Sequence, residues 1–90
     1  MTKFELGNTV MTRGVDEALE DRTELENIIL QRHAEGDWGD LDEHDVSANE
    51  DALENGGRLF SVYHLANGTK IYVITEWDRS VTTALLPQEY

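Results

Sequence analysis

The sequence predicts a small α+β domain in which an antiparallel β-meander of three to four strands packs against two to three helices. The first observation is the stretch Arg58–Leu86, where apolar, β-branched and aromatic residues outweigh charge. The second is Asn67-Gly68, which stands between two alternating runs and is the strongest short signal for a β-hairpin. The third is helical periodicity before this stretch, which supplies helices to cover one face of the sheet.

The meander is expected to consist of the strands Arg58–Leu65, Lys70–Thr75 and Val81–Leu86. The middle strand is apolar on both faces, which is typical of a central strand. Residues Glu76–Ser80 form the second reversal, and Pro87 ends the last strand because it has no N–H to donate.

The first twenty residues predict a short edge strand and a short helix. Phe4–Leu6 alternate in character, Gly7-Asn8 offers a turn, and Val10-Met11 continue the extended path. Apolar residues at helical spacing then predict a single helical turn over Val15–Glu20.

A second helix is expected to begin at Thr23, which forms a capping-box pattern with Glu26, and to end at Gly36. Its inward stripe recurs at i, i+3, i+4 and i+7, at Leu25, Ile28, Ile29 and Arg32. His33 falls at the border of that stripe.

A third helix is expected over Glu43–Glu54, capped by Asp42 and stopped by Gly56-Gly57. Asn49 falls on its inward face, where an unpaired amide costs on the order of 1–3 kcal/mol, so the amide requires partners. The loop Gly36–Asp40 that precedes this helix carries Trp38 and two glycines, and we expect it to be an ordered turn.

Composition limits the classes of function. The 90 residues form a single domain, 1–90, without cysteine and without an apolar run long enough to cross a membrane, so a soluble, cytoplasmic protein is expected. The net charge of −12 comes from 19 acids against 7 Lys and Arg, and it repels nucleic acid and anionic membranes. We therefore expect no direct DNA binding and no membrane partner.

No metal or cofactor is expected. The three histidines His33, His44 and His64 lack the spacing of a zinc site. The acids from Asp37 to Asp45 do not follow the ligand order of a calcium-binding loop.

The charge is concentrated between Arg32 and Arg58, where nine acids occur without any Lys or Arg. This run has a plain interpretation, a solvated face or a composition adapted to high salt, and a functional one, a surface that imitates the phosphates of nucleic acid and binds a basic cleft. The candidate partner-binding residues are Asp37, Trp38, Asp40, Asp42, Glu43, Asp45, Glu50 and Asp51.

Two motifs carry a resemblance to a known family. RHxxGDWGDL at positions 32–41 and TExDRSVTTxLLPxEY at positions 75–90 resemble a family of small proteins encoded on bacterial plasmids and other mobile elements. Members are labelled plasmid-related or restriction-system subunits, although this chain is too short for a methyltransferase or nuclease subunit. The resemblance implies that this is a small acidic protein encoded on mobile DNA, and a protein in that context is expected to act against host defence.

A looser similarity to the sheet of barnase-like ribonucleases implies an alternative function. A phosphate-directed hydrolase requires an acid–base pair and cationic groups, for which His33, Glu76, Asp78 and Arg79 are the candidates. Ordinary turn chemistry also accounts for the residues from Glu76 to Ser80.

The preferred hypothesis is a non-enzymatic interaction protein that binds a basic surface of a nucleic-acid-handling partner, as a DNA mimic. A small ribonuclease is the first alternative. A structural module without either activity is the second.

Overall fold

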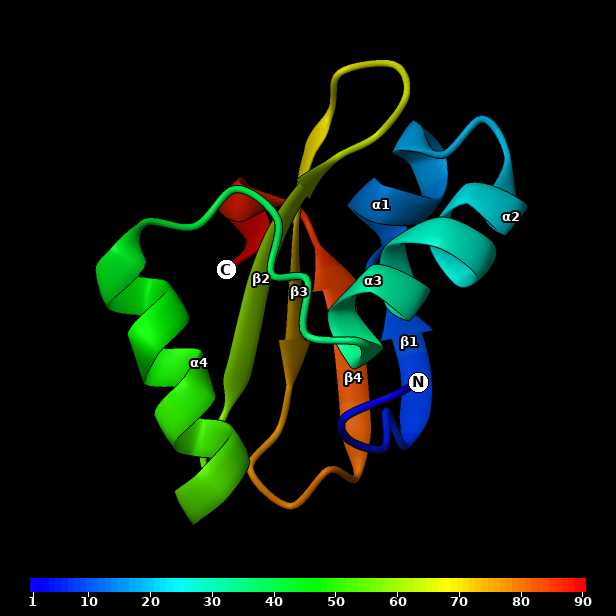
Figure 1. The fold of residues 1–90 in the computed structure, drawn as a ribbon. Coiled ribbons are helices and arrows are strands. Elements are labelled where there is room, and N and C mark those ends of the chain that lie inside the picture. The colour runs from blue at the N-terminus through cyan, green and yellow to red at the C-terminus, as the bar shows by residue number, and fades with distance from the viewer.

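The computed structural model describes all 90 residues and shows a four-stranded sheet with helices packed against it (Figure 1). The strands are β1 (Asn8–Met11), β2 (Leu59–His64), β3 (Lys70–Thr75) and β4 (Val81–Leu85). The helical elements are α1 (Arg13–Ala18), α2 (Arg22–Glu24), a π-helical turn (Leu25–Ile29), α3 (Leu30–Ala34), α4 (Glu43–Asn55) and a 3-10 turn (Pro87–Glu89). The predicted α+β fold is confirmed.

The predicted meander forms as expected, with β3 as the central strand. β2 pairs antiparallel with β3 from Leu59 opposite Thr75 to His64 opposite Lys70, and β3 pairs antiparallel with β4. In the hairpin loop only Gly68 has a positive φ, of 90°. Asn67 contributes through its side chain, which accepts a hydrogen bond from the Thr69 N–H at 3.0 Å, so the loop is not the two-residue turn that Asn-Gly most often forms.

The predicted edge strand exists, but its position and direction differ from the expectation. β1 begins at Asn8 and pairs parallel with β4, so the sheet is mixed, with strand order β1-β4-β3-β2. Phe4–Leu6 lie outside the strand because the chain turns at Gly7, whose φ is 67° and which lies against the Ser80 carbonyl. A parallel pairing is possible because five helical segments and two strands separate β1 from β4.

The second predicted helix runs continuously through α2, the π-helical turn and α3, and the turn changes which side chains face inward. Within the turn the Leu30 N–H bonds to the Leu25 carbonyl five residues back, which rotates the following residues relative to an α-helix. Ile28, expected on the inward stripe, is therefore 55% exposed. Leu30 and His33 take the buried positions instead, and Gly36 closes the helix with φ 81° as predicted.

The start of this helix also differs from the expectation. Asp21, not Thr23, is the N-cap: its carboxylate accepts from the Thr23 N–H at 2.9 Å and from the Thr23 hydroxyl at 2.7 Å. A carboxylate accepts such bonds more strongly than a hydroxyl, so the acid two residues earlier takes the position. The predicted capping box is wrong, and Glu26 stays exposed.

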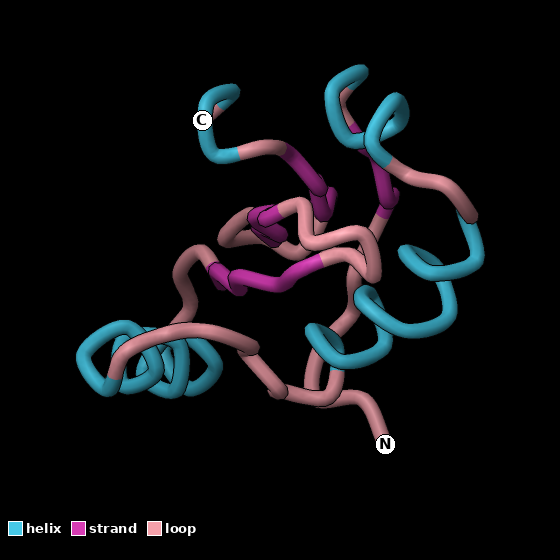
Figure 2. The backbone as a smooth tube through the Cα atoms, turned by 90° about the horizontal axis from the view of Figure 1, so that it is seen from above, coloured by secondary structure: helices cyan, strands magenta, loops and turns pink.

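The third predicted helix is confirmed as α4. Asp42 caps it by accepting from the Asp45 N–H at 2.9 Å, and Gly56 and Gly57 end it with φ of 85° and 138°. In the view from above, α4 lies on the same side of the sheet as α2–α3, alongside the outer edge of β2 (Figure 2).

Two apolar clusters hold the layers together. The larger one joins the inner face of the sheet to α1 and the α2–α3 helix, and it contains Val15, Leu25, Ile29, Leu30, Tyr63, Leu65, Ile71, Val73 and Ala84. The smaller one holds α4 against β2 and consists of Trp38, Ala52 and Leu59, with Phe4 and Leu53 at its rim. Because this second cluster is small, α4 depends on polar contacts as well.

The outer edge of β2 is closed by hydrogen bonds from outside the sheet. The Asn49 amide donates to the Phe60 carbonyl at 2.7 Å and accepts from the Phe60 N–H at 3.0 Å. Further along, Val62 pairs with the backbone of Trp38 and Asp40, where Gly39, with φ 73°, comes so close to the Val62 carbonyl that a Cβ would clash. Along Phe60 and Val62 this edge is therefore closed to another strand.

The outer face of the sheet carries aromatic residues, and only the C-terminal 3-10 turn packs near it. Phe60 and Tyr72 pack edge to face with ring centroids 4.9 Å apart, and Tyr90 packs against Tyr72 at 5.9 Å. With Arg58 and Ile74 they line a shallow pocket of about 380 Å³.

We predict that Asn49→Ala lowers the free energy of unfolding by about 1–3 kcal/mol, because it leaves the N–H and carbonyl of Phe60 without protein partners. Urea denaturation measures the change. Asn55→Ala, in the same helix, is the matched control, since the Asn55 amide reaches only the exposed Asp51 carboxylate. Equal effects of the two substitutions would contradict this role of Asn49.

Candidate protein-binding surface

Seven exposed carboxylates on α4 and in the loop before it form one acidic surface. We define the acidic surface as Asp40, Asp42, Glu43, Asp45, Glu50, Asp51 and Glu54. None of them forms an ion pair with Lys or Arg, and the one basic side chain within reach is the imidazole of His64, 3.8 Å from Asp40, which is charged only when protonated. The surface therefore keeps its negative charge, whereas five acids elsewhere pair with an arginine or the N-terminal amine.

The helical repeat brings three of these carboxylates onto one ridge. Glu43, Glu50 and Glu54 stand at i, i+7 and i+11, which places them on one face of α4, with Asp51 beside them. The opposite face carries Asn49 and Ala52, which are buried against β2. Glu43, Asp51 and Glu54 therefore point to solvent, while Glu50 also reaches the indole of the buried Trp38.

Two contacts from distant parts of the chain hold α4 in place. The Trp38 indole N–H donates to a Glu50 carboxylate oxygen at 2.9 Å. At the C-terminal end of α4, the Arg79 guanidinium donates to the Ala52 carbonyl at 3.1 Å and also to the Gly57 carbonyl. A cation at this end also interacts favourably with the helix dipole.

Two of the predicted partner-binding residues have structural positions instead. Trp38 is 5% exposed, stacks on Phe4 at 6.1 Å and meets His33 edge-on at 5.7 Å, so its ring cannot contact a partner. Asp37 accepts two hydrogen bonds from Arg32, at 2.8 and 3.1 Å, and these hold the pKa of Asp37 below its usual value. Its charge is paired within the molecule. The other six predicted residues all belong to the acidic surface.

The candidate catalytic residues do not form the predicted acid–base pair. Glu76 pairs with Arg58 at 3.4 Å, and Asp78 accepts from the N–H and hydroxyl of Ser80, which lowers the pKa of Asp78. Arg79 adopts φ 60° and donates only to backbone carbonyls. No pocket of the structure is lined by two of these residues, and none is lined by His33.

His33 lies at the centre of a buried hydrogen-bond chain. Its side chain is fully buried, with Nδ1 2.5 Å from the Ser61 hydroxyl and Nε2 2.9 Å from the Thr75 hydroxyl. Thr75 Oγ1 is 2.7 Å from Thr82 Oγ1, and the Thr82 hydroxyl donates to the Leu6 carbonyl at 2.7 Å.

The hydrogen-bond chain through His33 determines the tautomer of its imidazole. A carbonyl only accepts, so Thr82 uses its single proton on Leu6 and accepts from Thr75. Thr75 then has no proton left for the imidazole, so it accepts from Nε2–H, and Nδ1 accepts from Ser61. The arrangement thus suits a neutral imidazole. Burial, with a smaller contribution from the Arg79 charge, lowers the pKa of His33 from 6.5 to about 4.

No sequence pattern predicted this hydrogen-bond chain. Ser61, Thr75 and Thr82 come from three different strands, and each is fully buried on the inner face of the sheet. The available signal was that three hydroxyl residues occupy inward positions of a sheet that is otherwise apolar there. Such hydroxyls require a shared polar partner.

No family model, curated protein or solved structure matches this chain. The resemblance to proteins of mobile elements remains a prediction from its motifs. The structure contains no group of three or more histidines or acids placed to hold a metal ion. None of its helices has the length and apolar character needed to cross a membrane.

We predict that the free energy of unfolding falls by about 2 kcal/mol between pH 8 and pH 5, because only the unfolded chain protonates His33 in this range. The native imidazole stays neutral down to its pKa of about 4. The contribution of His33 to the free energy of unfolding is fully present above pH ~6.5, the pKa of histidine in the unfolded chain. It is lost as the pH falls toward 4.

Urea denaturation at both pH values, on the protein and on His33→Gln, measures this effect. The glutamine variant should be less stable at pH 8 and should lose much less on acidification. An equal loss in both proteins would contradict the assignment to His33.

Proposed function

We propose that this protein is a non-enzymatic interaction protein whose acidic surface binds a basic surface on a nucleic-acid-handling partner, in the manner of a DNA mimic. The observation that carries the proposal is the acidic surface itself: seven exposed carboxylates, none of them paired with Lys or Arg. Like charges brought this close destabilise a small fold, so a binding role offers a reason for them.

The density of charge supports this proposal. The 13 residues of α4 span ~20 Å, and five carboxylates of the acidic surface lie on them, about one per 4 Å. One strand of duplex DNA presents a phosphate every ~3.4 Å. A basic cleft that accommodates a DNA strand therefore meets a comparable spacing of charge on α4.

Rigid placement of α4 also favours recognition. A mimic binds well only if its charges are held at fixed positions before contact, because ordering them on binding costs affinity. The Asn49 side chain hydrogen-bonds α4 to β2, and the Ala52 carbonyl accepts a hydrogen bond from Arg79. The Glu50 carboxylate accepts a third from Trp38. The charges thus project from a fixed helix.

The distribution of charge favours a partner over adaptation to high salt. Acids occur all over the molecule, but the sequence between Arg32 and Arg58 has no Lys or Arg to balance them, whereas arginines outside the acidic surface pair with Glu17, Asp16, Asp37 and Glu76. The resemblance to proteins of plasmids and other mobile elements indicates the kind of partner. A host enzyme that acts on invading DNA fits both the charge and this context.

We predict that the immobilised protein retains a DNA-binding protein from a nuclease-treated bacterial lysate, and that duplex DNA displaces it. Displacement is expected because a mimic occupies the cleft that DNA uses. The complex should also dissociate in ~1 M salt, where the Debye length is ~3 Å. Mass spectrometry of the eluted protein identifies the partner.

Two triple variants of equal net charge make this test specific. Glu43→Gln/Asp51→Asn/Glu54→Gln should weaken retention about tenfold, because each exposed ion pair contributes ~0.5 kcal/mol. It keeps Asp42 as the cap and Glu50 as the partner of Trp38. The control variant, Glu17→Gln/Glu20→Gln/Glu35→Gln, should bind normally. Equal losses, or a complex that resists salt and DNA, would refute the proposal.

A further inference from the structure

The two edges of the sheet differ in how their backbone groups are satisfied. The outer edge of β2 is closed by Asn49 and by the backbone of Trp38 and Asp40. β1 forms the opposite edge, and no strand lies beyond it. It is the free edge of the molecule.

Alternate residues of β1 direct their backbone groups outward. The Asn8 N–H bonds to the Ser80 carbonyl at 2.9 Å and the Thr12 N–H bonds to the Ala84 carbonyl at 3.0 Å, so this set of alternate residues faces β4. Thr9 and Met11 therefore face away from the sheet. No other segment of the chain hydrogen-bonds to their N–H and carbonyl groups.

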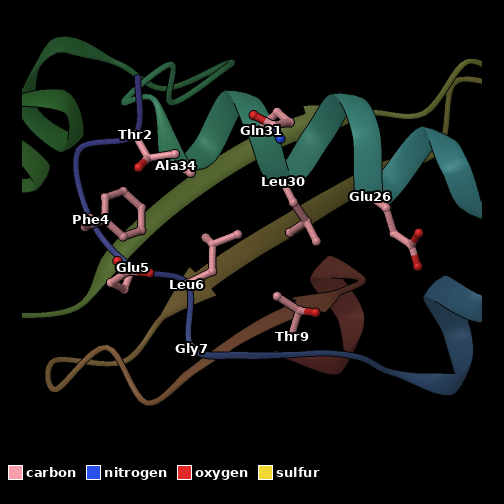
Figure 3. Close-up of a pocket in the computed structure, with 10 residues that line it drawn as sticks. All are labelled: Thr2, Phe4, Glu5, Leu6, Gly7, Thr9, Glu26, Leu30, Gln31 and Ala34. Carbon is pink, nitrogen blue, oxygen red and sulfur yellow. The ribbon is translucent and has the colours of Figure 1, made fainter.

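A groove runs beside this edge, between the N-terminal segment with β1 on one side and the α2–α3 helix on the other (Figure 3). Its main part has a volume of about 390 Å³, and a smaller part of about 70 Å³ continues along β1. Thr9, Glu26 and Leu30 line both parts, so the two form one groove.

The groove presents an acidic residue at each end and apolar residues between them. In Figure 3, Leu6 and Leu30 lie between Glu5 and Glu26. Neither glutamate forms an ion pair or a hydrogen bond within the protein. The nearby cation Lys3 lies against Gly36 and is not part of the lining.

We propose that β1 accepts an extended segment of a partner protein as a fifth strand, and that this segment carries a cationic, an apolar and a cationic residue at alternate positions. The free N–H and carbonyl groups of Thr9 and Met11 hold its backbone. Side chains of a strand alternate, so every second one faces the helix. The apolar side chain contacts Leu30, and the two cations reach Glu5 and Glu26.

The negative charge of the groove favours a cationic partner segment over a second copy of this protein. Pairing two β1 edges would bring two grooves that each carry Glu5 and Glu26 together, in molecules of net charge −12. Repulsion opposes such a dimer. The groove lies apart from α4, so this inference does not depend on the acidic surface having a partner.

The probe is the acetylated and amidated peptide TKTLTKT, titrated into isotope-labelled protein and followed by NMR. The largest amide shifts are expected at Thr9, Met11 and residues of the groove. Glu5→Gln/Glu26→Gln should weaken binding about fivefold, as expected for two exposed ion pairs. Glu17→Gln/Glu20→Gln removes the same charge outside both the groove and the acidic surface and should leave the affinity unchanged.

Backbone methylation distinguishes strand addition from simple charge attraction. One peptide is N-methylated at Lys, Leu and Lys, and a second at the two Thr residues between them. In a strand only one of these sets points at β1, so one peptide should lose about tenfold in affinity and the other little. Equal binding of both, shifts centred on α4, or self-association of the protein without peptide in sedimentation would each overturn the proposal.

Discussion

The hydrogen-bond chain through His33 is the interaction on which the rest of the structure depends. It joins α3, three strands and the N-terminal segment, because Ser61, Thr75, Thr82 and the Leu6 carbonyl all belong to it. Every group in it has a partner only while the imidazole is neutral, and a partly satisfied polar network is costly in a core. The chain therefore sets the position of the helix over the sheet, and with it the width of the groove beside β1.

From His33 the packing extends to α4 through aromatic rings. Phe4 and Trp38 both contact the imidazole, Trp38 bonds to Glu50, and Arg79 lies over Phe4 while it holds the last turn of α4. The acidic surface is thus attached to the core by the buried Trp38 and by the partly buried Phe4 and Arg79. These contacts connect His33 in the core to the carboxylates on α4. A loss of order at His33 would therefore make the position of α4 less fixed.

The two edges of the sheet divide the molecule into different kinds of surface. At β2 the edge is closed, and the helix that closes it carries uncompensated charge. At β1 the edge is open, and the adjoining helix carries a π-helical turn, a feature frequent at functional sites. That turn brings Leu30 inward and leaves Glu26 beside the groove. In both proposals the partner is cationic: the acidic surface would bind it through charge density, and the β1 groove through backbone pairing together with Glu5 and Glu26.

Features that depend on residues close together in the chain could be predicted from the amino-acid sequence. The hairpin at Asn67-Gly68, the Asp42 cap and the requirement for partners of Asn49 are local properties, and the structure confirms each. Tertiary structure decided the other features. These are the direction of β1, the π-helical turn, the burial of His33 and Trp38, and the separation of Glu76, Asp78 and Arg79 from one another's reach in any pocket. Each depends on contacts between residues far apart in sequence, such as His33 with Thr75, which local patterns do not encode.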